Sequence, residues 1–147
     1  MDTVTRTPAV AETAELRLAE TGDEEALRLL ATAHLGRVSF THQALPTIRL
    51  VNHLVDEGRI ILRTRSGTAL MQQALTGAIV AYQADELSPH SLEGWSVILT
   101  GVVTVVEDAE LIERYRDSLV PWIDKQADRF LSIRPGVITG YRIVAAV

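Results

Sequence analysis

Apolar and polar residues alternate with a period of two along most of the chain from Arg37 onwards, as they do in strands with one buried face. Short apolar runs bounded by turn residues add strands that are buried on both faces. The predicted strands are Arg37–Thr41, Thr47–Asn52, Arg59–Thr64, Ala78–Ala84, Gly94–Val106, Phe130–Ile133 and Ile138–Val144. A first hairpin centred near Ala44 would set Phe40 opposite Ile48.

Apolar residues recur at helical spacing in three other segments. In the first of them, Thr21 followed by Glu24 three positions later matches a capping box. The predicted helices run from Thr21 to just before Gly36, from Ser66 to Gly77, and from Asp108 to Leu119 with Asp108 as the cap. Residues 1–20 hold too few apolar positions for a packed element, so we expect an N-terminal tail there.

Six or so short strands with two or three helices predict a closed antiparallel barrel with helical decoration. Gly101, in the middle of the longest predicted strand, indicates a bulge or bend of the kind that a small barrel needs in order to close. We therefore expect a mainly β fold that forms one domain over residues 21–147.

Composition excludes several classes of protein. The 147 residues contain no cysteine, which removes disulfide frameworks, thiolate metal sites and cysteine nucleophiles. A net charge of −5, with Lys125 as the single lysine, argues against nucleic-acid binding. The longest apolar run is far shorter than the roughly 20 residues of a membrane span, and no secretory signal opens the chain. We expect a cytoplasmic protein with neither a nucleic-acid nor a membrane partner.

The segment Arg63–Thr68 carries the strongest chemical signal. Two arginines, three hydroxyls and a flexible glycine lie between a predicted strand and a predicted helix, where free N–H groups also gather. This is an inventory for binding a phosphate, although the lysine and glycine spacing of a P-loop is missing. The alternative is that Ser66 simply caps the helix and that both arginines are solvated.

No catalytic or metal-binding cluster is evident. The four histidines are dispersed without a spacing of three or four, so we expect no metal site, and His53 alone is a candidate ligand contact. No serine lies in a nucleophile elbow, so catalytic residues are left unassigned. Trp95 could stack on a planar ligand or fill one end of the barrel.

Several motifs, taken in order along the chain, resemble the pyridoxamine 5′-phosphate oxidase-like, FMN-binding split-barrel family. They are Leu35-Gly36-Arg37-Val38-Ser39-Phe40, Leu45-Pro46-Thr47-Ile48-Arg49-Leu50-Val51-Asn52-His53, Ile60-Ile61-Leu62-Arg63-Thr64, Val80-Ala81-Tyr82-Gln83-Ala84-Asp85, and Gly94-Trp95-Ser96-Val97 followed by Gly101. The resemblance extends from about Asp23 to Ile143. It implies a six-stranded antiparallel split barrel that forms a homodimer and holds FMN at the subunit interface.

The same resemblance implies roles for individual residues. The phosphate would be bound by Arg63, Thr64 and the loop to Thr68. The strand 49–52 would lie along the isoalloxazine ring. The segment 94–96 would approach the flavin, either from the same subunit or from the second one. The candidate cofactor-binding residues are Arg49, Leu50, Val51, Asn52, Arg63, Thr64, Arg65, Ser66, Thr68, Trp95 and Ser96.

Two departures from the family pattern keep the function open. Many relatives carry lysine at the position of Ala69 and proline at the position of Leu50. Loss of the lysine would weaken a phosphate site unless Arg65 replaces it. One hypothesis is an FMN-dependent oxidoreductase acting on a small planar substrate. The other is a non-catalytic protein that binds flavin, deazaflavin or haem.

Overall fold

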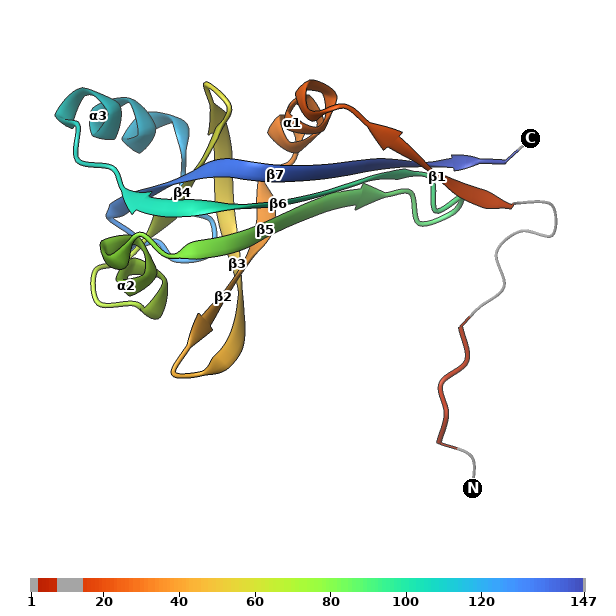
Figure 1. Ribbon diagram of the computed structural model, residues 1–147, viewed down its shortest axis with the longest axis horizontal. Helices are drawn as coiled ribbons and strands as arrows, with labels where there is room; N and C mark the ends of the chain where they lie inside the picture. The colour runs from red at the N-terminus through yellow and green to blue at the C-terminus, as the bar shows by residue number, and fades with distance from the viewer. Residues whose placement is uncertain (1–2, 8–14, 147) are drawn as a thin grey trace.

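The computed structural model of the chain describes residues 3–7 and 15–146. Seven strands and three helices follow one another in these residues (Figure 1). The strands are β1 Leu16–Thr21, β2 Leu35–His42, β3 Leu45–Asp56, β4 Arg59–Thr64, β5 Ile79–Leu87, β6 Gly94–Val105 and β7 Arg129–Ala145. The helices are α1 Asp23–Thr32, α2 Ala69–Thr76 and α3 Ala109–Ser118.

Strands β2 to β7 form a closed antiparallel barrel. The sheet order is β1-β7-β4-β3-β2-β5-β6, and an additional pairing of β6 with β7 closes the ring. In Figure 1, β5, β6 and β7 run side by side, while the β2–β3 hairpin crosses them and extends beyond the barrel. The prediction of a mainly β, six-stranded barrel with flanking helices is confirmed.

A seventh strand, β1, joins the barrel because β7 is longer than any partner. The first residues of β7 pair with β4, and its last residues, Gly140 to Ala145, pair on the same edge with β1. The predicted tail 1–20 is therefore corrected for residues 16–20, which belong to β1. The rest of the predicted tail is described only at residues 3–7 and 15.

Three further predictions are corrected by the structure. Phe40 pairs with Thr47 rather than Ile48, because the hairpin turns through Gln43 and Ala44, which both have positive φ. Helix α1 begins after Gly22 without a side-chain cap, so the capping box is wrong. The two last predicted strands form one strand, β7, whose Pro135–Gly136 stretch lies opposite the irregularity at Thr100/Gly101.

The bulge at Gly101 and the cap at Asp108 are both confirmed. A Cβ at position 101 would collide with the Arg134 carbonyl, so close approach of β6 and β7 requires glycine there. Asp108 accepts hydrogen bonds from the N–H groups of Glu110 and Leu111 and thereby caps α3.

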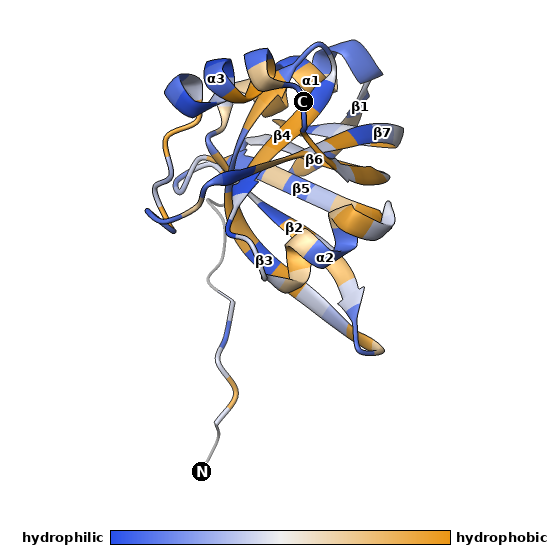
Figure 2. Ribbon diagram, turned by 90° about the vertical axis from the view of Figure 1, so that its left-hand side faces the viewer, coloured by the Kyte–Doolittle hydropathy of each residue, from blue (hydrophilic) through white to orange (hydrophobic). Residues whose placement is uncertain are grey.

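The main core fills the barrel and extends under α1 and α2. Apolar and polar residues alternate along β2 (Figure 2), because one face of this strand lines the core. In β3 the residues buried are Val51, Asn52 and His53, while its first six residues lie outside the core. A smaller cluster of Ile61, Tyr115, Leu119 and Phe130 packs α3 against the outside of the barrel. The helices therefore leave part of the outer sheet surface uncovered.

Candidate functional site

The barrel opens between β3 and β4. Residues Leu45–Asn52 of β3 pair with β2, and only His53–Asp56 pair with β4. The two strands therefore separate beside Arg63 and Thr64, and a cavity of about 260 Å³ lies there. Eight of the eleven candidate residues line it: Arg49, Leu50, Val51, Asn52, Arg63, Thr64, Arg65 and Thr68.

One end of this cavity carries hydroxyl and N–H donors. Thr68, not Ser66, caps α2: its Oγ1 accepts from the Met71 N–H at 3.1 Å and donates to the Arg65 carbonyl at 3.0 Å. The hydroxyl oxygen of Thr64 lies 3.1 Å from Oγ1 of Thr68. The N–H groups of Ala69 and Leu70, in the first turn of α2, have no acceptor in the described part of the chain. A helix N-terminus of this kind can bind an anion.

Arg63 is already committed to neighbouring backbone carbonyls. Its Nε donates to the Ala127 carbonyl at 2.8 Å, and its Nη1 donates to the Leu119 carbonyl at 2.7 Å. The guanidinium carbon also lies 5.0 Å from the centre of the Phe130 ring. Burial is the main cause that lowers the pKa of Arg63, and the positive charge of the nearby Arg116 guanidinium lowers it further. Its most direct role is therefore to hold the segment that follows α3.

That segment, Leu119–Asp128, forms one wall of the cavity. Its Trp122 N–H donates to the Asn52 side-chain oxygen at 2.7 Å, and its Asp128 N–H donates to the Thr64 carbonyl at 3.0 Å. The Asp124 carboxylate lies 2.8 Å from Nε of Arg65, and Asp124 itself lines the cavity. A carboxylate therefore lies where the sequence predicts a phosphate.

The remaining candidates lie elsewhere. Trp95 is only 5% exposed and belongs to the barrel core, so within one chain it fills the barrel. Ser96 follows it on β6, opposite Asp85 and Tyr141. Ser66 is in the loop before α2 but does not line the cavity. Leu50 lines the cavity and remains half exposed at its mouth.

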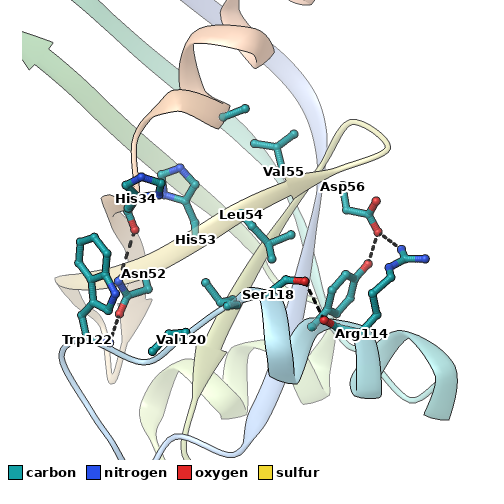
Figure 3. Close-up of a pocket in the computed structure, with 13 residues that line it drawn as sticks. His34, Asn52, His53, Leu54, Val55, Asp56, Arg114, Ser118, Val120 and Trp122 are labelled. Carbon is teal, nitrogen blue, oxygen red and sulfur yellow. Dashed lines mark hydrogen bonds and ion pairs between the residues drawn. The ribbon is translucent and has the colours of Figure 1, made fainter.

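A second, larger cavity of about 510 Å³ lies on the other side of the segment after α3 (Figure 3). Asn52 and the strip Val120–Asp124 separate the two cavities, since they contribute residues to both. At one end of the second cavity the ring centres of His34 and Trp122 are 5.4 Å apart. Sequence reasoning did not find this cavity, because its walls come from α1, β3 and α3.

His53 lies at the back of the second cavity but is 3% exposed. Its Nε2 is 2.8 Å from the Leu30 carbonyl, and its Nδ1 is 2.5 Å from the Tyr82 hydroxyl. A carbonyl only accepts, so Nε2 carries the proton and Nδ1 accepts from Tyr82. Burial lowers the pKa of His53 and raises that of Tyr82. Both ring nitrogens are thus occupied, and His53 is a core residue rather than the predicted ligand contact.

A charged network closes the far end of the second cavity. Oδ2 of Asp56 accepts from Arg114 and from the Tyr115 hydroxyl, both at 2.5 Å. The Tyr115 hydrogen bond is the main cause that lowers the pKa of Asp56, while burial and Asp56 raise the pKa of Tyr115 to about 12. Because each charge has a partner, this network joins α3 to β3 rather than offering a proton donor.

Residues 3–7 and 15–146 contain neither a cluster of metal-ligating side chains nor a helix long enough to span a membrane. No group of three or more His, Asp or Glu side chains there is placed to hold a metal ion. The helices α1, α2 and α3 have at most ten residues each, too short to cross a bilayer.

Comparison with known proteins decides the family. Residues 22–142 match the family described as pyridoxamine 5′-phosphate oxidase. The chain belongs to the pyridoxamine 5′-phosphate oxidase-like family. An uncharacterized protein of Mycobacterium tuberculosis is 48% identical in an alignment of 126 residues that covers 83% of this chain and 83% of the relative.

Solved structures of other proteins share the fold. An FAD-binding protein from Mycobacterium smegmatis superposes with a TM-score of 0.67 at 26% identity, covering 86% of this chain and 98% of its own. An FAD-binding protein from Mesorhizobium loti reaches a TM-score of 0.71 at 16% identity, covering 88% of this chain and 99% of its own. The family resemblance and the split-barrel fold predicted from the motifs are both confirmed.

Proposed function

We propose that this family member binds a flavin in the cavity between β3 and β4 and acts as a flavin-dependent oxidoreductase of the FMN-using type. The observation that supports this most is that eight residues predicted from two separate segments, 49–52 and 63–68, line one cavity in the split of the barrel. The FAD-binding neighbours support the ligand class. The specific cofactor, FMN, and the chemistry are part of the proposal.

The donors fit the phosphate end of such a cofactor. Thr64, Thr68, Arg65 and the two N–H groups of α2 would hold the anion, with the positive end of the helix dipole behind it. The cavity is smaller than a typical pocket for a whole ligand, so the ring would lie along the exposed edge of β3 near Leu50. A bound flavin would supply hydride transfer, and the chain's part is to orient it.

Substitution of Ala69 tests the phosphate assignment. Ala69→Glu places a carboxylate beside the proposed phosphate, so FMN affinity should fall about tenfold, while riboflavin affinity stays the same. A negative charge in the first helical turn should also raise the melting temperature of the empty protein slightly. Fluorescence titration with both flavins and a thermal melt measure these opposite effects.

Leu75→Glu is the matched control, because Leu75 is exposed on the same helix and does not line the cavity. It should leave both affinities unchanged. If wild type and Ala69→Glu bind FMN with equal affinity, the phosphate does not bind at this end of the cavity.

A second candidate function is flavin, deazaflavin or haem binding without turnover. The ionisable residues that line the cavity in the described part of the chain are three arginines and Asp124. None is suited to donate a proton near neutral pH, which favours this alternative. Stoichiometric flavin binding without oxidation of the reduced flavin by nitro- or quinone-type acceptors would support it over the oxidoreductase.

We also propose that the protein is a homodimer. Strand register gathers apolar side chains on the uncovered outer face of the barrel, and a monomer rarely exposes so large an apolar patch. Members of this patch are Ile48, Leu50, Ile79, Ala81, Ile98, Val102 and Val137. Leu50 belongs both to the patch and to the cavity, so a second subunit seated here would cover the cavity mouth.

Charge placed within this patch should separate the subunits. Ile98→Asp is expected to convert a sedimenting mass of two chains into that of one, because burying an unpaired carboxylate is costly. The control is Leu18→Asp on β1, since Leu18 is also exposed but lies outside the patch. A wild-type mass of one chain at micromolar concentration would contradict the homodimer.

A further inference from the structure

Cationic groups and one carboxylate surround the proposed phosphate position. Three guanidinium groups line the cavity, those of Arg49, Arg63 and Arg65. Arg63 donates to the carbonyls of Leu119 and Ala127, and Arg49 donates to the carbonyl of Ile48 in its own strand. Position 69 is alanine, so the first turn of α2 adds no side-chain cation.

Of these three arginines, Arg65 is the one that forms an ion pair with a carboxylate in the described part of the chain, that of Asp124. Oδ2 of Asp124 lies 2.8 Å from Nε of Arg65, and the side chain of Arg65 is half exposed at 52%. An incoming phosphate must either displace this carboxylate or bind beside it. Displacement costs the ion pair. Binding beside the carboxylate brings like charges together, at a cost that rises with the charge of the anion.

Asp124 is held in this position by contacts that do not depend on its charge. Its wall segment is anchored by the Trp122 N–H on Asn52 and by the Asp128 N–H on the Thr64 carbonyl. The Asp124 carbonyl accepts from the Ala127 N–H at 3.0 Å, and its Oδ1 accepts from the Gln126 N–H at 3.1 Å. An asparagine could keep the Oδ1 contact, which separates the effect of charge from the effect of shape.

We propose that Asp124 sets how strongly the site binds phosphate. It lowers the affinity for a phosphate monoester, as in FMN, more than the affinity for a singly charged phosphate diester. A monoester carries between one and a half and two negative charges near neutral pH, roughly twice the charge of a diester, and therefore meets the larger repulsion. This inference rests on the proposed flavin site and specifies how that site discriminates between flavin phosphates.

Titration of three flavins tests the proposal. Riboflavin has no phosphate, FMN has a monoester and FAD has diester phosphates only. Asp124→Asn should tighten FMN binding about fivefold to twentyfold, FAD binding by a smaller factor, and riboflavin binding by less than about twofold. Asp117→Asn makes the same change in net charge on α3, away from the cavity, and should alter none of the three.

The outcomes separate this inference from the flavin site itself. Unchanged or weaker FMN binding in Asp124→Asn overturns the role of Asp124, and so does an equal gain for riboflavin, which would mean that Asp124 controls access. In either case flavin binding by the wild type still stands. If neither wild type nor Asp124→Asn binds any of the three flavins, the proposed function fails and the inference fails with it.

Discussion

Arg63→Ala should lower the free energy of unfolding by about 2–4 kcal/mol, because the variant loses two hydrogen bonds from a charged donor and the contact with Phe130. The carbonyls of Leu119 and Ala127 would lose their donor, so the wall of the cavity would lose one anchor near each of its ends while the contacts with Asn52 and the Thr64 carbonyl remain. Urea unfolding followed by tryptophan fluorescence measures the change. Flavin affinity should fall as a consequence of the loosened wall.

Arg65→Ala is the matched comparison for this prediction. Arg65 makes an ion pair and a hydrogen bond on the surface, and such contacts contribute less than about 1 kcal/mol. We therefore expect a clear difference in urea midpoint between the two variants. If both unfold at the wild-type midpoint while Arg63→Ala alone loses FMN affinity, then Arg63 is a phosphate ligand and its carbonyl contacts are incidental.

The barrel could be predicted because its signals are local. The alternation of apolar and polar residues locates the strands, the run Arg59–Thr64 is found with its bounds unchanged, and Gly101 indicates the bulge. Strand β1 could not be predicted, because it has only six residues, none of them buried, and its pairing partner lies more than 100 residues away, in β7. The hairpin register depended on a turn in which two non-glycine residues adopt positive φ.

The sequence predicted most of the residues that line the candidate site, but it did not predict the hydrogen bonds and the ion pair that these residues form. Motif order brought together the residues of β3, β4 and the start of α2, since each motif lies within one element. The segment Leu119–Asp128 has no periodic pattern, so its bonds to Asn52, Thr64 and Arg65 follow from tertiary structure alone. That is why a phosphate ligand was expected where the folded chain places a carboxylate.

His53→Leu should lower the free energy of unfolding by about 2–4 kcal/mol at pH 8, because Leu30 and Tyr82 would keep buried polar groups without partners. The wild type should also lose stability as the pH falls. The folded-state pKa of His53 lies below the ordinary value, so the unfolded chain binds the proton more readily. The contribution of neutral His53 to the free energy of unfolding is therefore complete above about pH 6.5. Below that pH it declines, by up to about 1.4 kcal/mol for each pH unit.

Comparison of the wild type with His53→Leu isolates the effect of His53 on the pH dependence of stability, since carboxylates that titrate at lower pH affect both proteins alike. Urea midpoints at about pH 8, 6.5 and 5.5 should converge as the pH falls, because the leucine variant has no proton to gain at position 53. The neighbouring His34, whose charge further lowers the pKa of His53, gives the control variant His34→Gln. This variant should keep most of the wild-type slope. If the urea midpoints of wild type and His53→Leu change in parallel with pH, then His53 takes up its proton as readily in the folded chain as in the unfolded chain. The assignment of His53 as a neutral, hydrogen-bonded ring between α1 and β5 would then be wrong.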